Sequence, residues 1–383
     1  MKLLSTFIVS AVFFFSADAQ NVPVFGNEIP VTITGLTFDA MEPFISPDGN
    51  YLFFNSLNDG ITTSLYYAVR VNDSVFTYMG ALNGADQTVT PRLDAVASCD
   101  SVNNFYWTST RNWPAQYDNF FHGTFNGSDV VNTGRVHGNF YIYTPGWIVM
   151  DAAISTDGSL LWYCNAYFNN CSNMPCKAQL GVAAKLNDST FAKLANSDGL
   201  LMNVNDTNYD VYAPNISSDG LELYFTRILK NNPTQTTICV SVRNTLNDTF
   251  GLPVVVYGSP LLPEAATLTT DMSRMYYHKK PGSQYQIFLR YRTSPSGIEA
   301  TDNANPFFIA PNPCHDVLRI FSADGTAPGR VVIYDVAGQI VRTEADKTTL
   351  VDISALQAGV YFVSVMTAEK PAVIRIIKTY SGE

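Results

Sequence analysis

The feature that most constrains this chain is a motif that recurs five times, at a spacing of roughly 50 to 60 residues. Each copy has a short apolar run, a Ser-x-Asp-Gly-like turn and an aromatic run after the turn. The turns fall at residues 46–49, 97–101, 155–158, 217–220 and 269–271. A fixed period of this length, built from strands, indicates a β-propeller with one four-stranded blade per repeat. Five copies predict an all-β, five-bladed fold.

A second turn is repeated at one place in the blades. Asn-Asp or Asn-Gly recurs between the expected third and fourth strands, at Asn72, Asn126, Asn187 and Asn247. Both pairs tolerate positive φ and favour tight hairpins. They also match Asn-x-Ser/Thr glycosylation sequons. Because a sequon reading does not explain their equal positions in the repeats, we interpret them as turns.

The fifth copy lacks a fourth strand. It has three strands and then runs into a polar linker at 293–305. Residues 30–36 precede the first copy, just where a fourth strand precedes each later copy. We therefore expect residues 30–36 to close the last blade, which gives a propeller over residues 20–292 with protected strand edges.

The first 19 residues have the pattern of a signal peptide. Lys2 is followed by an apolar run from Leu3 to Phe15, and Ala17 and Ala19 form a small-x-small cleavage site. No later run reaches 18 apolar residues, so we expect no membrane span in the mature chain.

The charge balance excludes some partners. The chain has 23 Lys and Arg against 33 Asp and Glu, a net charge of −10. Nucleic acids and anionic membrane surfaces bind clustered positive charge, so neither is expected as a partner.

The cysteines point to a loop disulfide. Six cysteines in an exported chain allow pairing. Cys171 and Cys176 are the best local pair, with Cys164 as a nearby competitor. The four histidines are scattered, so no metal site and no cofactor are expected. A calcium ion held by carboxylates is left open.

These repeats resemble the WD40-like, TolB-type propellers. The resemblance rests on the Ser-x-Asp-Gly turns and the aromatic strands after them, and it covers about residues 30–292. It implies a fold and says little about function, because the Asp and Gly of the turn have a structural task.

The C-terminal segment has a different residue pattern from the repeats. Its alternating strands and turn residues predict a small antiparallel β-sandwich. The motifs run in the order Pro-Asn-Pro, Tyr-Asp-x-x-Gly, Ser-x-Leu-x-x-Gly-x-Tyr and a terminal Ile-x-Lys strand, at 311–313, 334–338, 354–361 and 376–378. In this order they resemble the type A sorting domain of the type IX secretion system, over residues 306–383.

That resemblance implies a Bacteroidota-type cell. The signal peptide would direct the chain to the periplasm, and residues 306–383 would engage the type IX machinery to cross the outer membrane. The product would be secreted or displayed at the outer-membrane surface. An immunoglobulin-like carbohydrate-binding appendage is the alternative for this segment.

A five-bladed propeller has a central funnel lined by the first strand of each blade, and ligands bind at its mouth. The polar residues expected there, and so the candidate ligand-binding residues, are Asp39, Glu42, Arg92, Asp151, Asp210 and Glu264. Aligning the turns puts Glu42 opposite Thr90, Asp151, Ala213 and Ala265. Trp113 and Trp147 fall in insertions and are expected at an exposed mouth, whereas Trp107 and Trp162 are expected between blades.

Three functions are consistent with this pattern. We favour a non-catalytic module that binds a glycan or a surface protein, because no catalytic motif is recognisable. The alternative is a glycoside hydrolase or polysaccharide lyase, with Asp39, Asp151 and Glu264 as the candidate catalytic acids. A structural component of the cell envelope is the third reading.

Overall fold

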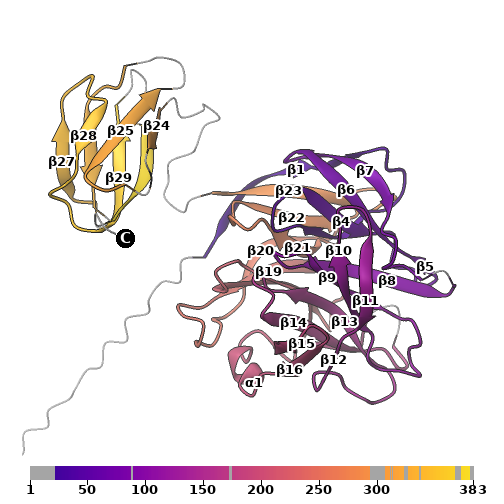
Figure 1. Ribbon diagram of the computed structural model, residues 1–383. Helices are drawn as coiled ribbons and strands as arrows, with labels where there is room; N and C mark the ends of the chain where they lie inside the picture. Colours follow the sequence, from indigo (N-terminus) through magenta and orange to yellow (C-terminus); the bar gives the residue numbers. More distant parts are fainter. Residues whose placement is uncertain are drawn as a thin grey trace, which may run out of the picture. The chain divides into compact units, whose positions relative to one another are not determined.

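The computed structural model describes residues 22–293, except 88 and 172–174, and residues 307–379, except 311, 313, 323–326, 336–337 and 367–371 (Figure 1). The chain divides into two compact units, Met1–Gly297 and Ile298–Glu383. The expected signal peptide (1–19) lies outside the described residues, as does the expected linker (293–305) apart from Thr293.

The first unit is a five-bladed β-propeller, as the repeats predict. Each blade is an antiparallel sheet of four principal strands. From the inner strand outward, blade one has β3 (Met41–Ile45), β4 (Tyr51–Asn55), β6 (Leu65–Asn72) and β7 (Val75–Ala81). Blade two has β8 (Arg92–Cys99), β9 (Asn104–Ser109), β10 (Phe120–Phe125) and β11 (Val130–Arg135).

Blades three to five repeat this order. Blade three has β13 (Trp147–Ile154), β14 (Leu160–Tyr167), β15 (Lys177–Asn187) and β16 (Thr190–Lys193). Blade four has β17 (Tyr209–Ile216), β18 (Glu222–Leu229), β19 (Thr236–Val242) and β20 (Val254–Ser259). Blade five has β21 (Glu264–Leu268), β22 (Arg274–Lys279), β23 (Gln286–Thr293) and β1 (Val24–Pro30). Short strands β2 (Thr32–Thr34), β5 (Thr62–Thr63) and β12 (His137–Gly138) pair in parallel with β7, β8 and β16.

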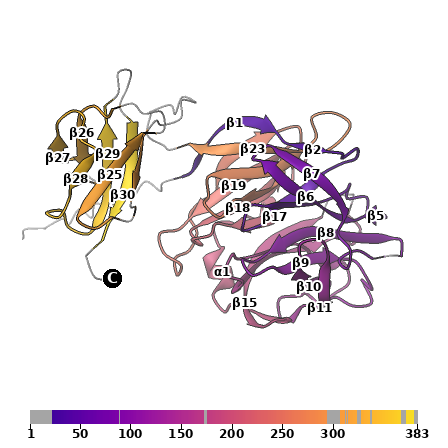
Figure 2. The same cartoon turned by 45° about the horizontal axis from the view of Figure 1, so that its top comes forward.

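The N-terminal segment closes the ring, but with different residues from those expected. Strand β1 pairs antiparallel with β23, so residues 24–30 complete the last blade (Figure 2). The expected closing segment, 30–36, instead supplies β2 to blade one. Val24–Pro30 lacks a regular apolar alternation, whereas Thr32–Thr34 has the β-branched residues typical of a strand. The position before the first repeat therefore indicated a closing strand, but it pointed to the second of two neighbouring strands instead of the first.

Aromatic side chains fill the spaces between blades. Trp107 of blade two is fully buried and packs with Phe53 of blade one. Trp162 of blade three is 1% exposed and packs with Phe225 of blade four. Both tryptophans lie where the repeat register predicts them, because alternate residues of each second strand face opposite neighbouring blades.

The disulfide lies at the end of blade three. Cys171 and Cys176 are joined across the connection from β14 to β15, with Cα atoms 5.6 Å apart. Cys164 is buried and unpaired on β14, so it does not compete for the bridge.

The second unit is a small β-sandwich. One sheet contains β24 (Phe307–Ala310), β25 (Val317–Ser322) and β28 (Leu350–Asp352). The other contains β27 (Ile340–Glu344), β26 (Val331–Tyr334), β29 (Gly359–Val365) and β30 (Ala372–Lys378). Buried side chains of both sheets, such as Leu318, Ile333 and Val363, form one core. Among the described residues, no helix is long and apolar enough to cross a bilayer.

Candidate functional site

Three of the predicted acids meet in the propeller funnel. Glu42, Asp151 and Glu264 come from the inner strands of blades one, three and five, and lie close enough for their charges to interact. Asp151 is 2% exposed, and the Glu264 side chain is 17% exposed. The repeat register thus predicts a real cluster of carboxylates.

A β-bulge in each inner strand sets the direction of these side chains. The pairing register shifts inside β3, β8, β13, β17 and β21. In four blades the equivalent bulge residue has a left-handed backbone, with φ of 50° to 55°: Glu42, Val96, Ala213 and Ala265. Val96, and not the expected Thr90, is therefore the blade-two equivalent of Glu42. The expected alignment failed there because blade two has a longer connection before its turn.

Three of these four left-handed residues turn their N–H towards a polar side chain on a second strand. The Val96 N–H donates to Asn55 Oδ1 at 3.3 Å, and the Ala265 N–H donates to Thr226 Oγ1 at 3.0 Å. The Glu42 N–H donates to His278 Nδ1 at 2.9 Å. In all three pairs the acceptor belongs to the preceding blade of the ring. These bonds satisfy buried backbone donors and join successive blades.

Blade three departs from this rule. By alignment of the turns Asp151 is the equivalent residue, but it pairs with Cys164, the register shift falls between Val149 and Asp151, and its φ is not left-handed. Asp151 Oδ2 accepts the Ala213 N–H at 3.0 Å. It replaces Cys164, which occupies the acceptor position on β14 but has only a weak thiol acceptor. Correspondingly, Thr108 Oγ1 in the preceding blade has no hydrogen-bond partner among the described residues. The Asp151 carboxylate therefore has a structural task between blades three and four.

Burial sets the protonation of the cluster. It raises the pKa of Asp151 to about 7. It also raises the pKa of Glu264 to about 7, although a 3.0 Å hydrogen bond from Tyr212 acts in the opposite direction. Burial, and then the charge of Asp151, raise the pKa of Glu42 well above its ordinary range. The cluster therefore keeps protons at neutral pH, as expected of acids that share a dry site.

His278 is neutral in this environment. Burial lowers its pKa to about 3. Its Nδ1 accepts the Glu42 N–H, so the ring proton is on Nε2, 3.7 Å from Glu264 Oε2. Glu42 Oε1 accepts a hydrogen bond from Asn58 at 2.9 Å, and Glu42 Oε2 has no partner among the described residues.

The central channel beside these acids is narrow. Its cavity measures about 30 Å³, and inner-strand residues such as Phe44, Ala153 and Pro214 line it. This volume is that of about one water molecule. Within the described parts of the chain, no group of three or more His, Cys, Asp and Glu residues is placed to hold a metal ion.

The other predicted polar residues do not join the cluster. The Asp39 carboxylate accepts the Tyr285 N–H at 2.8 Å, and Arg92 Nε donates to Ser64 Oγ at 3.0 Å. Asp210 accepts the Ala178 N–H at 2.9 Å and pairs with Lys230 at 3.5 Å.

The two insertion tryptophans make contacts within the protein. Trp113 Nε1 donates to the Trp147 carbonyl at 3.1 Å, and the Trp147 ring lies 5.4 Å from the Tyr167 ring. Both side chains are half-buried. They tie the insertion of blade two to the start of blade three.

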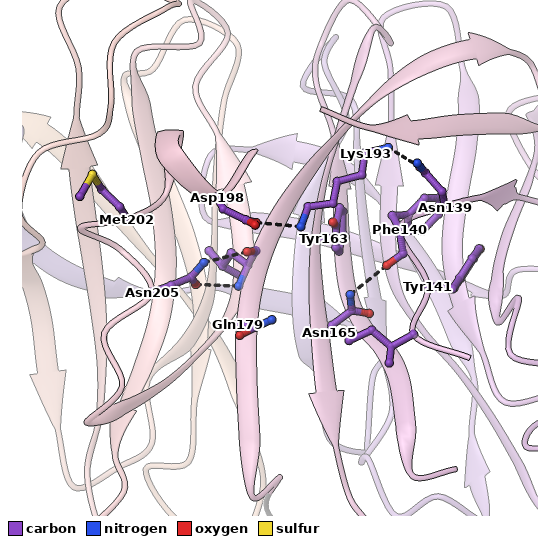
Figure 3. A pocket seen from close by; sticks show the side chains of 12 residues that line it. Asn139, Phe140, Tyr141, Tyr163, Asn165, Gln179, Lys193, Asp198, Met202 and Asn205 are labelled. Carbon is purple, nitrogen blue, oxygen red and sulfur yellow. Dashed lines mark hydrogen bonds and ion pairs between the residues drawn. The ribbon is translucent and has the colours of Figure 1, made fainter. Parts of the chain in front are cut away.

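A larger pocket, which the sequence analysis missed, lies off the axis on blade three (Figure 3). Its volume is about 390 Å³. Tyr163 and Asn165 of β14 and Gln179 of β15 contribute to it from the sheet. The flanking segments 139–142 and 193–205 contribute the remaining walls.

The pocket arises because the outer strand of blade three is short. Strand β15 has 11 residues and β16 only 4, so the ladder between them starts at Ala183. Beyond it, side chains from the following segment replace the missing strand. Ser197 Oγ accepts the Val182 N–H at 3.0 Å, and Asn205 bonds both the N–H and the carbonyl of Leu180 at 2.8 Å. The edge of β15 is satisfied and space remains above the sheet.

The preceding segment closes the opposite side. Asn139 Oδ1 accepts the Lys193 N–H at 2.7 Å, and the Phe140 carbonyl accepts a bond from Asn165 Nδ2 at 2.9 Å. Short helix α1 (Ser197–Leu200) carries Asp198, which pairs with Lys193 at 2.7 Å. Both walls are thus bonded to blade three itself.

The C-terminal unit matches a known family. Residues 309–379 match the model of the secretion system C-terminal sorting domain. This domain indicates export by the type IX secretion system and attachment at the cell surface or outer membrane. A comparison with curated proteins finds none that matches the chain in sequence.

Several solved structures are similar in fold. PorZ, a surface component of the type-IX secretion system of Porphyromonas gingivalis, is 15% identical with a TM-score of 0.34; the match covers 90% of this chain and 52% of PorZ. This chain thus spans about half the length of PorZ. A family 117 glycoside hydrolase from Zobellia galactanivorans is 10% identical with a TM-score of 0.48, over 71% and 91% of the two chains. A putative TolB from Agrobacterium tumefaciens is 15% identical with a TM-score of 0.31, over 90% of each chain.

Proposed function

We propose that this exported β-propeller is a non-catalytic binding module for a glycan outside the cell. Its C-terminal unit is a secretion-system sorting domain, so the propeller is the part delivered. We infer further that residues 1–19 are the signal peptide of a Bacteroidota-type cell and are removed on export. Residues 306–383 then meet the type IX machinery.

The observation that supports binding over catalysis is the contrast between the two cavities. The central cavity measures about 30 Å³, which cannot admit a sugar ring, and Glu42 is the one carboxylate among its lining residues. The pocket of about 390 Å³ has a size typical of small-molecule sites, but Asp198 is the only carboxylate among its lining residues. Glycoside hydrolysis needs two carboxyl groups on opposite sides of the bond that breaks. Carboxylates and space for a sugar are thus in different places.

A glycan-active enzyme is the second candidate, and one observation favours it. Burial brings the pKa of both Asp151 and Glu264 to about 7, which suits a general acid at neutral pH. Asp151, however, bonds the Ala213 N–H, and Glu264 bonds Tyr212. These contacts give both acids a structural reason to be where they are. Asp39, the third expected acid, bonds a loop backbone.

The test combines release and retention on one panel of polysaccharides. The purified full chain is incubated with each polysaccharide, and new reducing ends and retained protein are both measured. We expect retention on at least one polysaccharide with no release of reducing ends. Asp151→Asn and Glu264→Gln should be retained as well as the natural chain. Release that either substitution abolishes would overturn the proposal in favour of the enzyme.

A further inference from the structure

We propose that the off-axis pocket of blade three binds one neutral sugar residue of the glycan. The inference rests on the proposed function and adds a place and a ligand class to it. The pocket contains a buried acceptor without a partner, two neighbouring amides, one ion pair and two aromatic rings.

The unmet acceptor is Asn165 Oδ1. The residue is 6% exposed, and its Nδ2 donates to the Phe140 carbonyl at 2.9 Å. That bond fixes the amide, yet Oδ1 is buried without a partner among the described residues. Leaving a buried acceptor unpaired costs free energy, because the desolvation of the oxygen is not offset by a hydrogen bond. A ligand hydroxyl recovers this free energy when it enters the pocket and displaces the side chains that cover Asn165 Oδ1, which has almost no accessible surface.

A second amide lies beside the first. Gln179 is the direct cross-strand partner of Asn165, so both side chains project from the same face of the sheet (Figure 3). Gln179 is exposed at the pocket. An amide both donates and accepts, and so does a hydroxyl, so two neighbouring amides suit adjacent hydroxyl groups of a sugar.

The charges in the pocket balance. Lys193 and Asp198 pair at 2.7 Å and are the only formally charged residues that line it. The Asp198 carboxylate would repel a carboxylated or sulfated sugar, and the Lys193 ammonium group would repel a cationic ligand. A neutral sugar meets neither penalty, and it can use the free lone pairs of Asp198 and the donors of Lys193.

An apolar wall completes the site. The rings of Phe140 and Tyr163 lie 5.2 Å apart between centroids and line the pocket. Gly181 faces Tyr163 across the sheet, and a Cβ there would lie 2.3 Å from Tyr163 Cζ. The glycine therefore lets the ring lie across β15. Aromatic rings next to hydrogen-bonding groups complement a sugar, which has hydroxyl edges and C–H faces.

The experiment measures which glycans bind and whether the pocket binds them. The full chain is screened against neutral and acidic glycans, and the dissociation constant of the best ligand is then measured by calorimetry. Gln179→Ala, on an exposed side chain, should weaken binding about tenfold. Asp198→Asn should weaken it several-fold, and Asn165→Leu should weaken it further. Lys177→Ala, two residues along the same strand but outside the pocket, is the control and should leave affinity unchanged.

The outcomes separate this inference from the proposed function. Binding of a neutral glycan that weakens in the pocket variants, with unchanged melting temperature for Gln179→Ala, supports both. Glycan binding that none of these substitutions alters overturns the pocket and leaves the proposed function standing. Preference for acidic glycans overturns the ligand class. Failure to bind any glycan overturns the proposed function, and this inference with it.

Discussion

Blade three departs from the other blades at both ends, with opposite consequences. At its inner end Asp151 replaces the left-handed bulge residue of the other four blades, and its carboxylate takes up the Ala213 N–H. At its outer end the short β16 leaves the edge of β15 to side chains from the next segment. The first departure adds a buried carboxyl group between blades three and four, and the second leaves an open pocket. A departure from a repeat therefore marks a functional site only where it also leaves room for a ligand.

The largest expected effect concerns the inner end and its dependence on pH. The native pKa of Asp151 is about 7, above the value near 4 of an unfolded chain, so the native state binds the extra proton. The contribution of this proton to the unfolding free energy is therefore present in full below about pH 4 and is lost as the pH rises from about 4 to about 7. Asp151→Asn keeps an acceptor for Ala213 but cannot ionise. We expect the natural chain to lose about 2 to 3 kcal/mol more unfolding free energy than this variant between pH 4.5 and 7.5.

Urea unfolding at several pH values measures that difference. Asp188→Asn, which changes an exposed carboxylate in a turn of the same blade, is the control and should follow the natural chain. Parallel pH profiles for the natural chain and Asp151→Asn would show that the inner acid is not buried in a proton-retaining cluster.

The next effect concerns the outer end. Gly181→Ala places a Cβ against the Tyr163 ring, which is 3% exposed and has little room to move. We expect a loss of about 1 to 3 kcal/mol in unfolding free energy, typical of an overpacked core, and weaker glycan binding. Gly199→Ala, in α1, meets nothing within 4 Å and is the matched control. Equal stability of the two variants would mean that the wall of the pocket is loose.

The smallest effect separates two equivalent threonines. Thr226 accepts the Ala265 N–H, whereas Thr108 Oγ1 has no partner among the described residues because blade three uses Asp151 instead. Thr226→Val should cost about 1 kcal/mol, and Thr108→Val about zero or less. Chemical denaturation of each variant measures its unfolding free energy. A similar loss in both would remove the distinction between blade three and the other blades at the inner end.

More of the fold than of the candidate site could be predicted from the sequence. The Ser-x-Asp-Gly turns predict five blades because each turn must be made locally, by a residue with positive φ such as Gly49, Gly158 or Gly220. The sequence predicted that the N-terminal segment closes the ring, but the residues that do so are 24–30 and not 30–36. Strands β1 and β2 are adjacent in the chain, and the segment that looks more like a strand joins blade one. The residue types within a strand do not determine which sheet edge the strand pairs with.

The funnel cluster and the pocket differ in the same way. Glu42 and Asp151 lie at equivalent repeat positions and Glu264 directly precedes the next one, Ala265, so the register brings all three acids close together. The pocket takes Asn165, Gln179 and the Lys193–Asp198 pair from separate segments that share no motif. One signal was available: the interval from Asp157 to Asp219 is the longest between successive turns. An insertion at that point marks where a blade is built differently.

Ring closure has a consequence for how the chain folds. Thr293 Oγ1 bonds the Val24 carbonyl across 269 positions, and the whole β1–β23 ladder has a similar separation. Contacts of such high order are slow to form because loop-closure entropy opposes them. We therefore expect β1 to dock last, after the other blades have assembled. Until it does, β23 presents an unpaired edge, and Val24–Pro30 of another molecule can occupy it. The interval before closure is thus when this chain is most exposed to domain-swapped association.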